Sequence, residues 1–328
     1  MTKVLILTSE KRVKKFYDLA ALPKDWELIY AEDLKTDEEI LKKAPDADYI
    51  FADAIREVGA NLMAQMPNLK LVHSEGVAFN KIDTAAAKAK GIYVCNNAAA
   101  NAVAVAEHAI MLMLAMQRRL LEGDMMVRTG KQIQAKGAFI LDGVCELNAA
   151  HIGLVGFGMI AKETAKRLNA FGCKISCFDA YRNEQAEKDL GVGYLPIEEL
   201  LAQCDIVSLH LPVTPETTDF MDAEKLAMMK PTAILLNTAR GELIDQIALA
   251  KVLEEGKIAG AAFDTLTPEP VLPDNPLLNL SESCRYKVLF SPHIAGTTLQ
   301  AFQTMHKTVW NNIMAVERGD KPINICNP

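Results

Sequence analysis

Three features are missing from this sequence of 328 residues, and each absence excludes a class of protein. The seven cysteines are dispersed, with no C-x-x-C pair and no histidine at zinc spacing, so we expect reduced thiols, a cytoplasmic location and no metal site. Acidic and basic residues, 42 against 35, are scattered rather than blocked, which argues against nucleic acid or a membrane as the main partner. No apolar run is long enough for a signal peptide or a membrane span, and the longest window, 98–116, contains Asn101, Glu107 and His108.

Short apolar runs alternate with amphipathic stretches along nearly the whole chain, which is typical of α/β proteins. The length indicates two domains, and runs without polar interruption are typical of parallel strands covered on both faces. The predicted strands form two series, at 4–7, 49–52, 69–73 and 92–94, and then at 152–155, 175–178, 206–209, 233–236, 260–263 and 288–290. We place the domain change near 97–101 and expect a last helix, about 298–318, to pack back on the first domain.

The strongest local signal is a strand that breaks into glycines and then opens a helix, over residues 153–161. It fits the dinucleotide fingerprint G-x-G-x-x-G/A, with Ala161 in the third position. Gly156 permits the tight turn, and Gly158 lets the backbone approach a pyrophosphate that faces the amides at the helix N-terminus. The predicted pyrophosphate contacts are Gly156, Gly158, Met159 and Ile160.

Asp179 follows 23 residues after Gly156, at the end of the next predicted strand. A carboxylate there accepts hydrogen bonds from the ribose hydroxyls of NAD and repels the 2′-phosphate of NADP. The sequence therefore favours NAD, while the nearby Arg182 keeps NADP as an alternative. The other interpretation is a glycine turn with a solvated aspartate.

Three further segments, 237–241, 265–270 and 291–296, each follow a predicted strand and carry a chemically useful side chain. Ligands in open α/β sheets bind outside the carboxyl ends of the strands, so Arg240, Glu269 and His293 could converge beside a cofactor. Each residue also has an ordinary explanation: a cap or surface ion pair for Arg240, a solvated carboxylate for Glu269, and a hydrogen-bonded core histidine for His293.

With these residues identified, the sequence resembles the D-2-hydroxyacid dehydrogenase family of NAD-dependent enzymes over nearly its whole length. The matching motifs are Leu69-Lys70-Leu71-Val72 with Gly76 and Ile82-Asp83, Val105-Ala106-Glu107, the turn Gly156 to Ala161, the segment Leu209 to Thr217, Asn237 to Gly241, and Ser291-Pro292-His293. The resemblance implies two doubly wound parallel-sheet (Rossmann-like) domains with the active site in the cleft between them. The substrate domain would comprise 1–99 and 297–328, and the NAD-binding domain 100–296.

The resemblance also implies roles for individual residues. It assigns catalysis to Arg240, Glu269 and His293, and substrate binding to the backbone amides of Gly76 and Val77 together with Arg240 and His293. It implies further cofactor contacts at His210, Pro212, Thr217, Thr238, Ala239, Asp264, His293 and Gly296. Members of the family are commonly dimers whose NAD-binding domains pair, so we expect a homodimer.

The expected reaction transfers a hydride between NAD(H) and a 2-oxo acid or D-2-hydroxy acid, and the protein must supply position and a proton. The planar fork of Arg240 suits the substrate carboxylate and the keto oxygen. His293 suits proton donation, because imidazole titrates near neutrality and an adjacent Glu269 favours its protonated form. The glutamate argues against the related formate dehydrogenases, which carry glutamine there.

Departures from the family pattern bear on the substrate rather than on the chemistry. The segment 131–138 lacks a tryptophan often found there, and the loop 74–79 carries the carboxylate of Glu75. The nearest cations in sequence are Arg56 and Lys81, so we expect an uncharged side group, as in pyruvate, hydroxypyruvate, glyoxylate or a branched 2-oxo acid. The alternatives are a phosphoglycerate-type dehydrogenase, a phosphite-oxidising relative and a non-catalytic NAD-sensing dimer.

Overall fold

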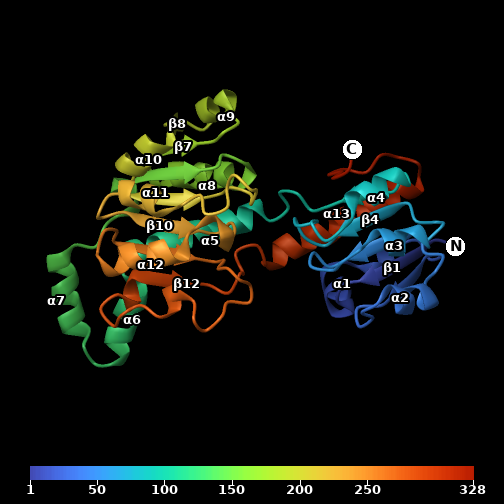
Figure 1. Cartoon of the computed structure of the whole chain (residues 1–328), viewed down its shortest axis with the longest axis horizontal. Coiled ribbons are helices and arrows are strands. Elements are labelled where there is room, and N and C mark those ends of the chain that lie inside the picture. The colour runs from blue at the N-terminus through green and yellow to red at the C-terminus, as the bar shows by residue number, and fades with distance from the viewer. The chain divides into compact units, whose positions relative to one another are not determined.

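The computed structural model describes residues 1–328 and divides into two compact units (Figure 1). The first unit contains Met1–Asn101 and Thr297–Pro328, and the second contains Ala102–Gly296. Each unit is built on one parallel sheet, of five and seven strands respectively, with helices between the strands. The predicted α/β class with two doubly wound sheets is confirmed.

The five-stranded sheet of the first unit has the order β2-β1-β3-β4-β5, and all of its strand pairs are parallel. Its strands are β1 (Lys3–Leu7), β2 (Glu27–Tyr30), β3 (Tyr49–Ala52), β4 (Leu71–Ser74) and β5 (Tyr93–Cys95). Its helices are α1 (Glu10–Phe16), α2 (Asp37–Lys43), α3 (Ala60–Ala64), α4 (Thr84–Ala89) and α13 (Leu299–Glu317). This order places a switch in winding direction between β1 and β3, which is where such sheets bind ligands.

Helix α13 belongs to the first unit although it follows the second unit in the chain. Successive side chains of β1 point to opposite faces of the sheet, and Val4 and Ile6 share one buried cluster with Trp310 of α13. Leu5 and Leu7 join the cluster on the other face. The last helix therefore packs on the first sheet, as the sequence predicted.

The seven-stranded sheet of the second unit has the order β12-β11-β10-β9-β6-β7-β8 and is also parallel throughout. Its strands are β6 (His151–Val155), β7 (Lys174–Phe178), β8 (Gly193–Tyr194), β9 (Ile206–Leu209), β10 (Ile234–Asn237), β11 (Gly260–Phe263) and β12 (Val288–Phe290). Its helices are α5 (Ala102–Gln117), α6 (Leu120–Arg128), α7 (Gln132–Asp142), α8 (Met159–Phe171), α9 (Glu184–Asp189), α10 (Ile197–Gln203), α11 (Ala223–Met228) and α12 (Gln246–Glu254). Helices α5 and α8 cover one face, and α10, α11 and α12 cover the other.

Helices α6 and α7 pack on each other and project away from the seven-stranded sheet (Figure 1). They expose many apolar side chains, namely Leu120, Leu121, Met125, Val127, Ile133, Ile140 and Leu141. Apolar patches of this kind on a folded domain mark interaction surfaces.

The sequence did not predict strands β2 and β8, and both lie at sheet edges. Neither strand has a fully buried residue, because a sheet edge is covered less completely than its centre. A short, partly exposed strand lacks the unbroken apolar run that marks the central strands.

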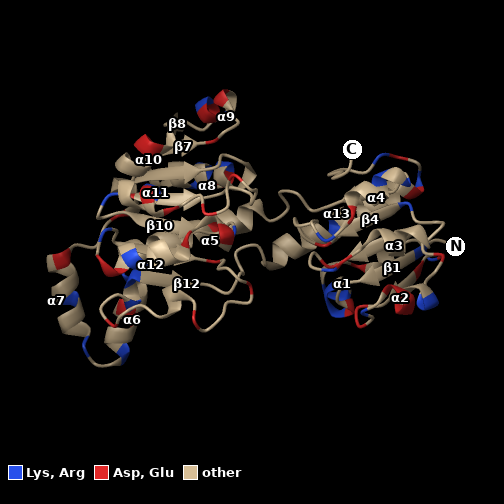
Figure 2. Cartoon of the chain, viewed as in Figure 1, with Lys and Arg blue, Asp and Glu red and all other residues tan.

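Charge is distributed without large blocks in both units. Figure 2 shows Lys and Arg interspersed with Asp and Glu on the helices and loops. None of the helices combines the length and apolar character required to traverse a lipid bilayer.

Candidate functional site

The glycine turn between β6 and α8 leaves room for a ligand at the N-terminus of α8. Gly156 has a φ of +90°, and a Cβ on it would lie 2.8 Å from the carbonyl oxygen of His210, so only glycine fits. A Cβ on Gly158 would meet no atom within 4 Å, so this side of the turn is open. No side chain caps α8, and the first amides of the helix, at Met159 and Ile160, are available to an anion.

Asp179 lies directly after β7 and faces the glycine turn. Its Oδ2 accepts a hydrogen bond of 2.6 Å from the amide of Phe157, and its Oδ1 accepts one of 2.8 Å from the amide of Tyr181. The neighbouring Arg182 is turned to other partners: it forms an ion pair of 2.7 Å with Glu187 and stacks on the ring of Tyr194 at 4.0 Å. The carboxylate, rather than the guanidinium, therefore lies at the turn.

The segment after β9 is held by hydroxyl groups. Thr217 Oγ1 donates to the carbonyl of Pro212 at 2.7 Å and accepts from the amide of Thr214 at 2.7 Å, which fixes the turn. His210 Nε2 lies 3.0 Å from Ser208 Oγ, and desolvation lowers the pKa of His210 to about 4. His210 is therefore neutral at pH 7.

Arg240 projects from a turn that Asn237 holds in place after β10. The Asn237 side chain donates to the carbonyl of Arg240 at 2.7 Å and accepts from the amide of Ala239 at 3.0 Å. Arg240 is exposed, and its guanidinium donates to the carbonyl of Ala239 at 2.6 Å and pairs with no carboxylate. The Thr238 hydroxyl is buried without a hydrogen-bond partner. The turn thus offers a free guanidinium beside an unsatisfied hydroxyl.

Glu269 and His293 come from different loops and form a direct pair. His293 Nδ1 lies 2.7 Å from Oε1 and 2.9 Å from Oε2 of Glu269, and Nε2 has no protein partner. The side chain of His293 is 41% exposed and that of Glu269 is 57% exposed. The alternative interpretation of His293 as a core histidine is therefore wrong. His293 has a φ of +54°, a conformation that costs energy in a residue other than glycine and that clusters at functional sites.

The carboxylate of Asp264 organises the loop that carries His293, a function that the sequence did not indicate. Its two oxygens accept from the amides of Ile294 and Ala295, at 3.0 and 2.8 Å, and Oδ1 also accepts from Ser291 Oγ. His108 of α5 lies 2.8 Å from the same Ser291 hydroxyl. Asp264 is buried, and Gly296, the last residue of the second unit, follows this loop.

In the first unit, the loop after β4 presents two unpaired amides. No protein group accepts from the N–H groups of Gly76 and Val77, whereas their carbonyls accept from the Asn97 amide and from the Asn96 side chain. Main-chain N–H groups without an acceptor are available to bind an anion.

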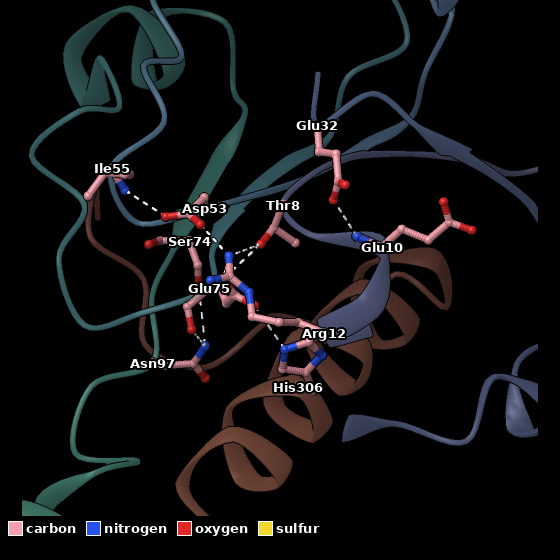
Figure 3. Close-up of polar contacts among 10 residues, drawn as sticks. All are labelled: Thr8, Glu10, Arg12, Glu32, Asp53, Ile55, Ser74, Glu75, Asn97 and His306. Atoms are coloured by element: carbon pink, nitrogen blue, oxygen red, sulfur yellow. Dashed lines mark hydrogen bonds and ion pairs between the residues drawn. The ribbon is translucent and has the colours of Figure 1, made fainter. Parts of the chain in front are cut away.

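The residue before these amides, Glu75, is buried in a charged cluster that joins helices α1 and α13 to the segments after β1, β3 and β4 (Figure 3). Its Oε2 accepts from Thr8 Oγ1 at 2.8 Å and pairs with Arg12 Nη2 at 2.7 Å, and its Oε1 lies 3.0 Å from His306 Nε2. Arg12 also pairs with Asp53. Arg12 of α1 is therefore a cation beside this loop, in addition to Arg56 and Lys81, which sequence proximity had suggested.

The predicted residues fall into two sets, one in each unit. The second unit carries all of the predicted catalytic and cofactor-binding residues, at the carboxyl ends of β6, β7, β9, β10, β11 and β12. The first unit carries Gly76 and Val77 at the carboxyl end of β4. The open side of Gly158, the Asp179 carboxylate and the unpartnered Thr238 hydroxyl fit a dinucleotide, which needs a backbone approach, a ribose acceptor and additional polar contacts.

Comparison with known proteins gives the same result. The sequence model of the D-isomer specific 2-hydroxyacid dehydrogenase NAD binding domain matches residues 110–295. A glyoxylate reductase of Korarchaeum cryptofilum is 38% identical over 288 residues, which is 88% of this chain and 85% of the relative. The structure of a D-2-hydroxyisocaproate dehydrogenase superposes with a TM-score of 0.88 at 25% identity, with 100% of both chains covered.

A D-lactate dehydrogenase of Aquifex aeolicus, solved with NAD and lactic acid, superposes with a TM-score of 0.80 at 27% identity, covering 100% of this chain and 99% of that chain. The family model, the related sequences and the superposed structures all indicate the same family. The chain belongs to the D-isomer specific 2-hydroxyacid dehydrogenases, and it is an NAD-binding oxidoreductase that transfers hydride between 2-oxo acids and 2-hydroxy acids.

Proposed function

We propose that the protein reduces a small 2-oxo acid with an uncharged side group to the D-2-hydroxy acid, and catalyses the reverse reaction, with NAD(H) as cofactor. The observation that carries this proposal is the pair formed by His293 and Glu269, in which one ring nitrogen is held at 2.7 Å and the other is free to exchange a proton. The relative from Korarchaeum cryptofilum is a glyoxylate reductase, and glyoxylate meets the description of the substrate.

The second unit supplies the residues that would hold the cofactor. Gly156, Gly158 and the first amides of α8 would bind its pyrophosphate, and Asp179 would bind its ribose. Polar contacts would come from His210, Pro212, Thr217, Thr238, Ala239, Asp264 and Gly296. NADH, when bound, supplies the hydride.

Arg240 would bind the substrate carboxylate and polarise the keto oxygen. Its guanidinium is exposed and free of any carboxylate partner, so its charge is available to a ligand. A planar fork binds a carboxylate through two parallel hydrogen bonds, and it stabilises negative charge that develops on the carbonyl oxygen.

His293 would give its proton to the keto oxygen during reduction and take it back during oxidation. Glu269 holds Nδ1, so Nε2 is the nitrogen that exchanges the proton. A proton donor must carry its proton before reduction, and a proton acceptor must be free of it before oxidation. Reduction should therefore weaken as pH rises, and oxidation should weaken as pH falls.

The free amides of Gly76 and Val77 would bind the substrate carboxylate in the first unit. Both N–H groups lack a protein acceptor, whereas the carbonyls of the loop are satisfied. The loop is therefore prepared for an anion and needs no rearrangement of its own hydrogen bonds to bind one.

We propose a preference for NAD over NADP. The Asp179 carboxylate lies at the glycine turn, and the nearby Arg182 is engaged by Glu187 and Tyr194. A 2′-phosphate would be repelled by this carboxylate.

A substrate panel tests the proposed function. We expect NADH oxidation with glyoxylate, pyruvate, hydroxypyruvate or 4-methyl-2-oxopentanoate, and a kcat/KM with NADPH lower by roughly tenfold or more, about the effect of one well-placed charge. The measurement is loss of absorbance at the nicotinamide band for about a dozen 2-oxo acids with each cofactor. Best activity on 3-phosphohydroxypyruvate would instead favour the phosphoglycerate-type alternative. Tight NADH binding without any turnover would favour the NAD-sensing alternative.

We propose that two copies pair through the NAD-binding domain, with α6 and α7 in the interface. These helices expose several large apolar side chains, and homodimer interfaces are more apolar than ordinary surface. Sedimentation should give twice the chain mass of 35.9 kDa, and replacing Leu121 and Ile140 together by glutamate should yield monomers. A wild-type protein that sediments as a monomer at micromolar concentration would contradict this.

We also propose a cytoplasmic location. All seven cysteines are free thiols in the structure, including the exposed Cys145. Unpaired thiols persist in a reducing compartment.

A further inference from the structure

Asn97 is a fully buried polar residue beside the loop with the free amides, and no step of the proposed function uses it. It lies in the first unit, two residues after β5. Its side-chain oxygen Oδ1 is buried without a hydrogen-bond partner. A buried acceptor without a partner costs free energy, so an asparagine at this position is explained by the groups to which its nitrogen atoms donate.

The donors of Asn97 hold the carbonyl groups of three consecutive residues. The side-chain nitrogen Nδ2 donates to the carbonyl of Glu75 at 2.8 Å and to the carbonyl of Ser74 at 3.3 Å. The backbone amide of Asn97 donates to the carbonyl of Gly76 at 2.9 Å. Figure 3 shows the Asn97 side chain directed at the loop. Asn97 therefore holds the backbone of the loop from one side.

The geometry of the peptide group connects these carbonyls to the free amides. The peptide bonds that join Glu75, Gly76 and Val77 are trans, so the C=O and N–H of each peptide group point in opposite directions. The N–H of Gly76 shares a peptide group with the Glu75 carbonyl, and the N–H of Val77 shares one with the Gly76 carbonyl. Because Asn97 binds both carbonyls, both N–H groups face away from it, and neither has a protein acceptor.

We propose that Asn97 is a positioning residue for substrate binding, which orients the amides of Gly76 and Val77 toward the substrate carboxylate. The inference rests on the proposed function, because it assigns those amides to the carboxylate of the same substrate. Without the side-chain donor, the peptide group after Glu75 is free to rotate and to present its carbonyl oxygen in place of an N–H. A carbonyl oxygen at that position would repel the carboxylate.

The rest of the loop does not depend on the Asn97 side chain. The Ser74 hydroxyl donates to the carbonyl of Ala78 at 2.6 Å, and the side chain of Glu75 pairs with Arg12 at 2.7 Å. The backbone amide of Asn97 is kept by any substitution other than proline. Replacing the side chain should therefore change the orientation of the first free amide and leave the loop in place.

The test is the steady-state kinetics of Asn97→Leu with the best substrate of the panel. Leucine is similar in size to asparagine but has no donor. We expect the KM for the 2-oxo acid to rise by roughly tenfold or more, the effect of one hydrogen bond to a charged group. The kcat should change little, because the carboxylate is bound equally in the ground state and in the transition state. Titration of NADH fluorescence should give an unchanged dissociation constant.

The division of the effect between KM and kcat separates positioning from a structural role. A loss of folded enzyme lowers the apparent kcat and leaves KM unchanged, which is the opposite of the expected result. Asn97→Ser is the conservative variant, because its hydroxyl keeps one donor, and its KM should lie between those of the wild type and Asn97→Leu. If Asn97→Leu does not fold, Asn97→Ser decides, and a wild-type KM there would overturn the inference.

A matched control removes a similar side-chain amide elsewhere in the same sheet. Asn327 donates from Nδ2 to the carbonyl of Ile92 at 2.8 Å, and its Oδ1 accepts from the amide of Val94 at 2.8 Å, so Asn327→Leu should leave KM unchanged. An unchanged KM in Asn97→Leu, or an equal rise in Asn327→Leu, would overturn the inference while the wild-type activity still supports the proposed function. A wild-type enzyme that reduces no 2-oxo acid would overturn the proposed function itself and the inference with it.

Discussion

Replacing His293 by asparagine should lower kcat for 2-oxo acid reduction by roughly 10²–10⁴-fold, the usual contribution of a positioned proton donor. Asparagine can hydrogen-bond to Glu269 and tolerates positive φ better than most residues, so the loop conformation at +54° should persist. The measurement is kcat at saturating NADH and 2-oxo acid. Titration of NADH fluorescence checks that cofactor binding is retained.

Glu269→Gln separates the proton donor from the residue that holds it. This variant keeps the imidazole but removes the carboxylate that lies 2.7 Å from Nδ1. Glutamine no longer pairs a carboxylate with Nδ1, so the imidazole loses the partner that fixes its orientation, and kcat for 2-oxo acid reduction should fall by roughly tenfold or more. Equal kcat in the wild type and in Glu269→Gln would contradict the assigned coupling, and near wild-type turnover in His293→Asn would contradict the role of the histidine.

Arg240→Lys is expected to lower kcat/KM by roughly 10²–10³-fold, similar to the loss of one donor that stabilises developing negative charge. Lysine keeps the positive charge but loses the planar fork, so bidentate binding of the carboxylate and polarisation of the keto oxygen cannot occur together. Steady-state kinetics with the best substrate of the panel measure the loss. The dissociation constant of NADH should change little, since the guanidinium would contact the substrate.

A matched control for Arg240→Lys lies in the same unit. Arg285 is exposed and bonded to Glu282 and Tyr286, away from the turn after β10, so Arg285→Lys should retain full activity. Equal kinetics of the two lysine variants would show that Arg240 does not bind the substrate through its fork.

Much of the fold could be predicted from the sequence, because the central strands of both sheets are buried on both faces. Strand β3 consists of apolar residues alone, β9 has one polar residue, Ser208, and the helix between 159 and 171 ends at a glycine with φ of +78°. The edge strands β2 and β8 were missed because partial exposure permits polar residues and glycine. Strand propensity is a weaker predictor at a sheet edge, because residues that are not buried need not be apolar.

Part of the candidate site could likewise be predicted from the sequence, and part could not. The glycine turn, Asp179 and the pair of His293 and Glu269 follow strands directly, so strand order alone suggested their positions. The charged cluster could not be foreseen, because Arg12 sits in a run of basic residues typical of a solvated helix, and its partners Asp53 and Glu75 come from later strands. Only the folded structure shows that Arg12, which the sequence places on a solvated helix, reaches the buried carboxylate of Glu75.

The position of α13 affects the order in which the two units can fold during synthesis. The five-stranded sheet emerges first during synthesis, yet one of its faces is only partly covered, by Val13 and Leu22, until Trp310 and its neighbours arrive from the far end of the chain. The second unit, continuous in sequence, has all of its parts well before that moment. On the ribosome, the intervening unit can therefore reach its native state while the unit that starts the chain still waits for its last helix.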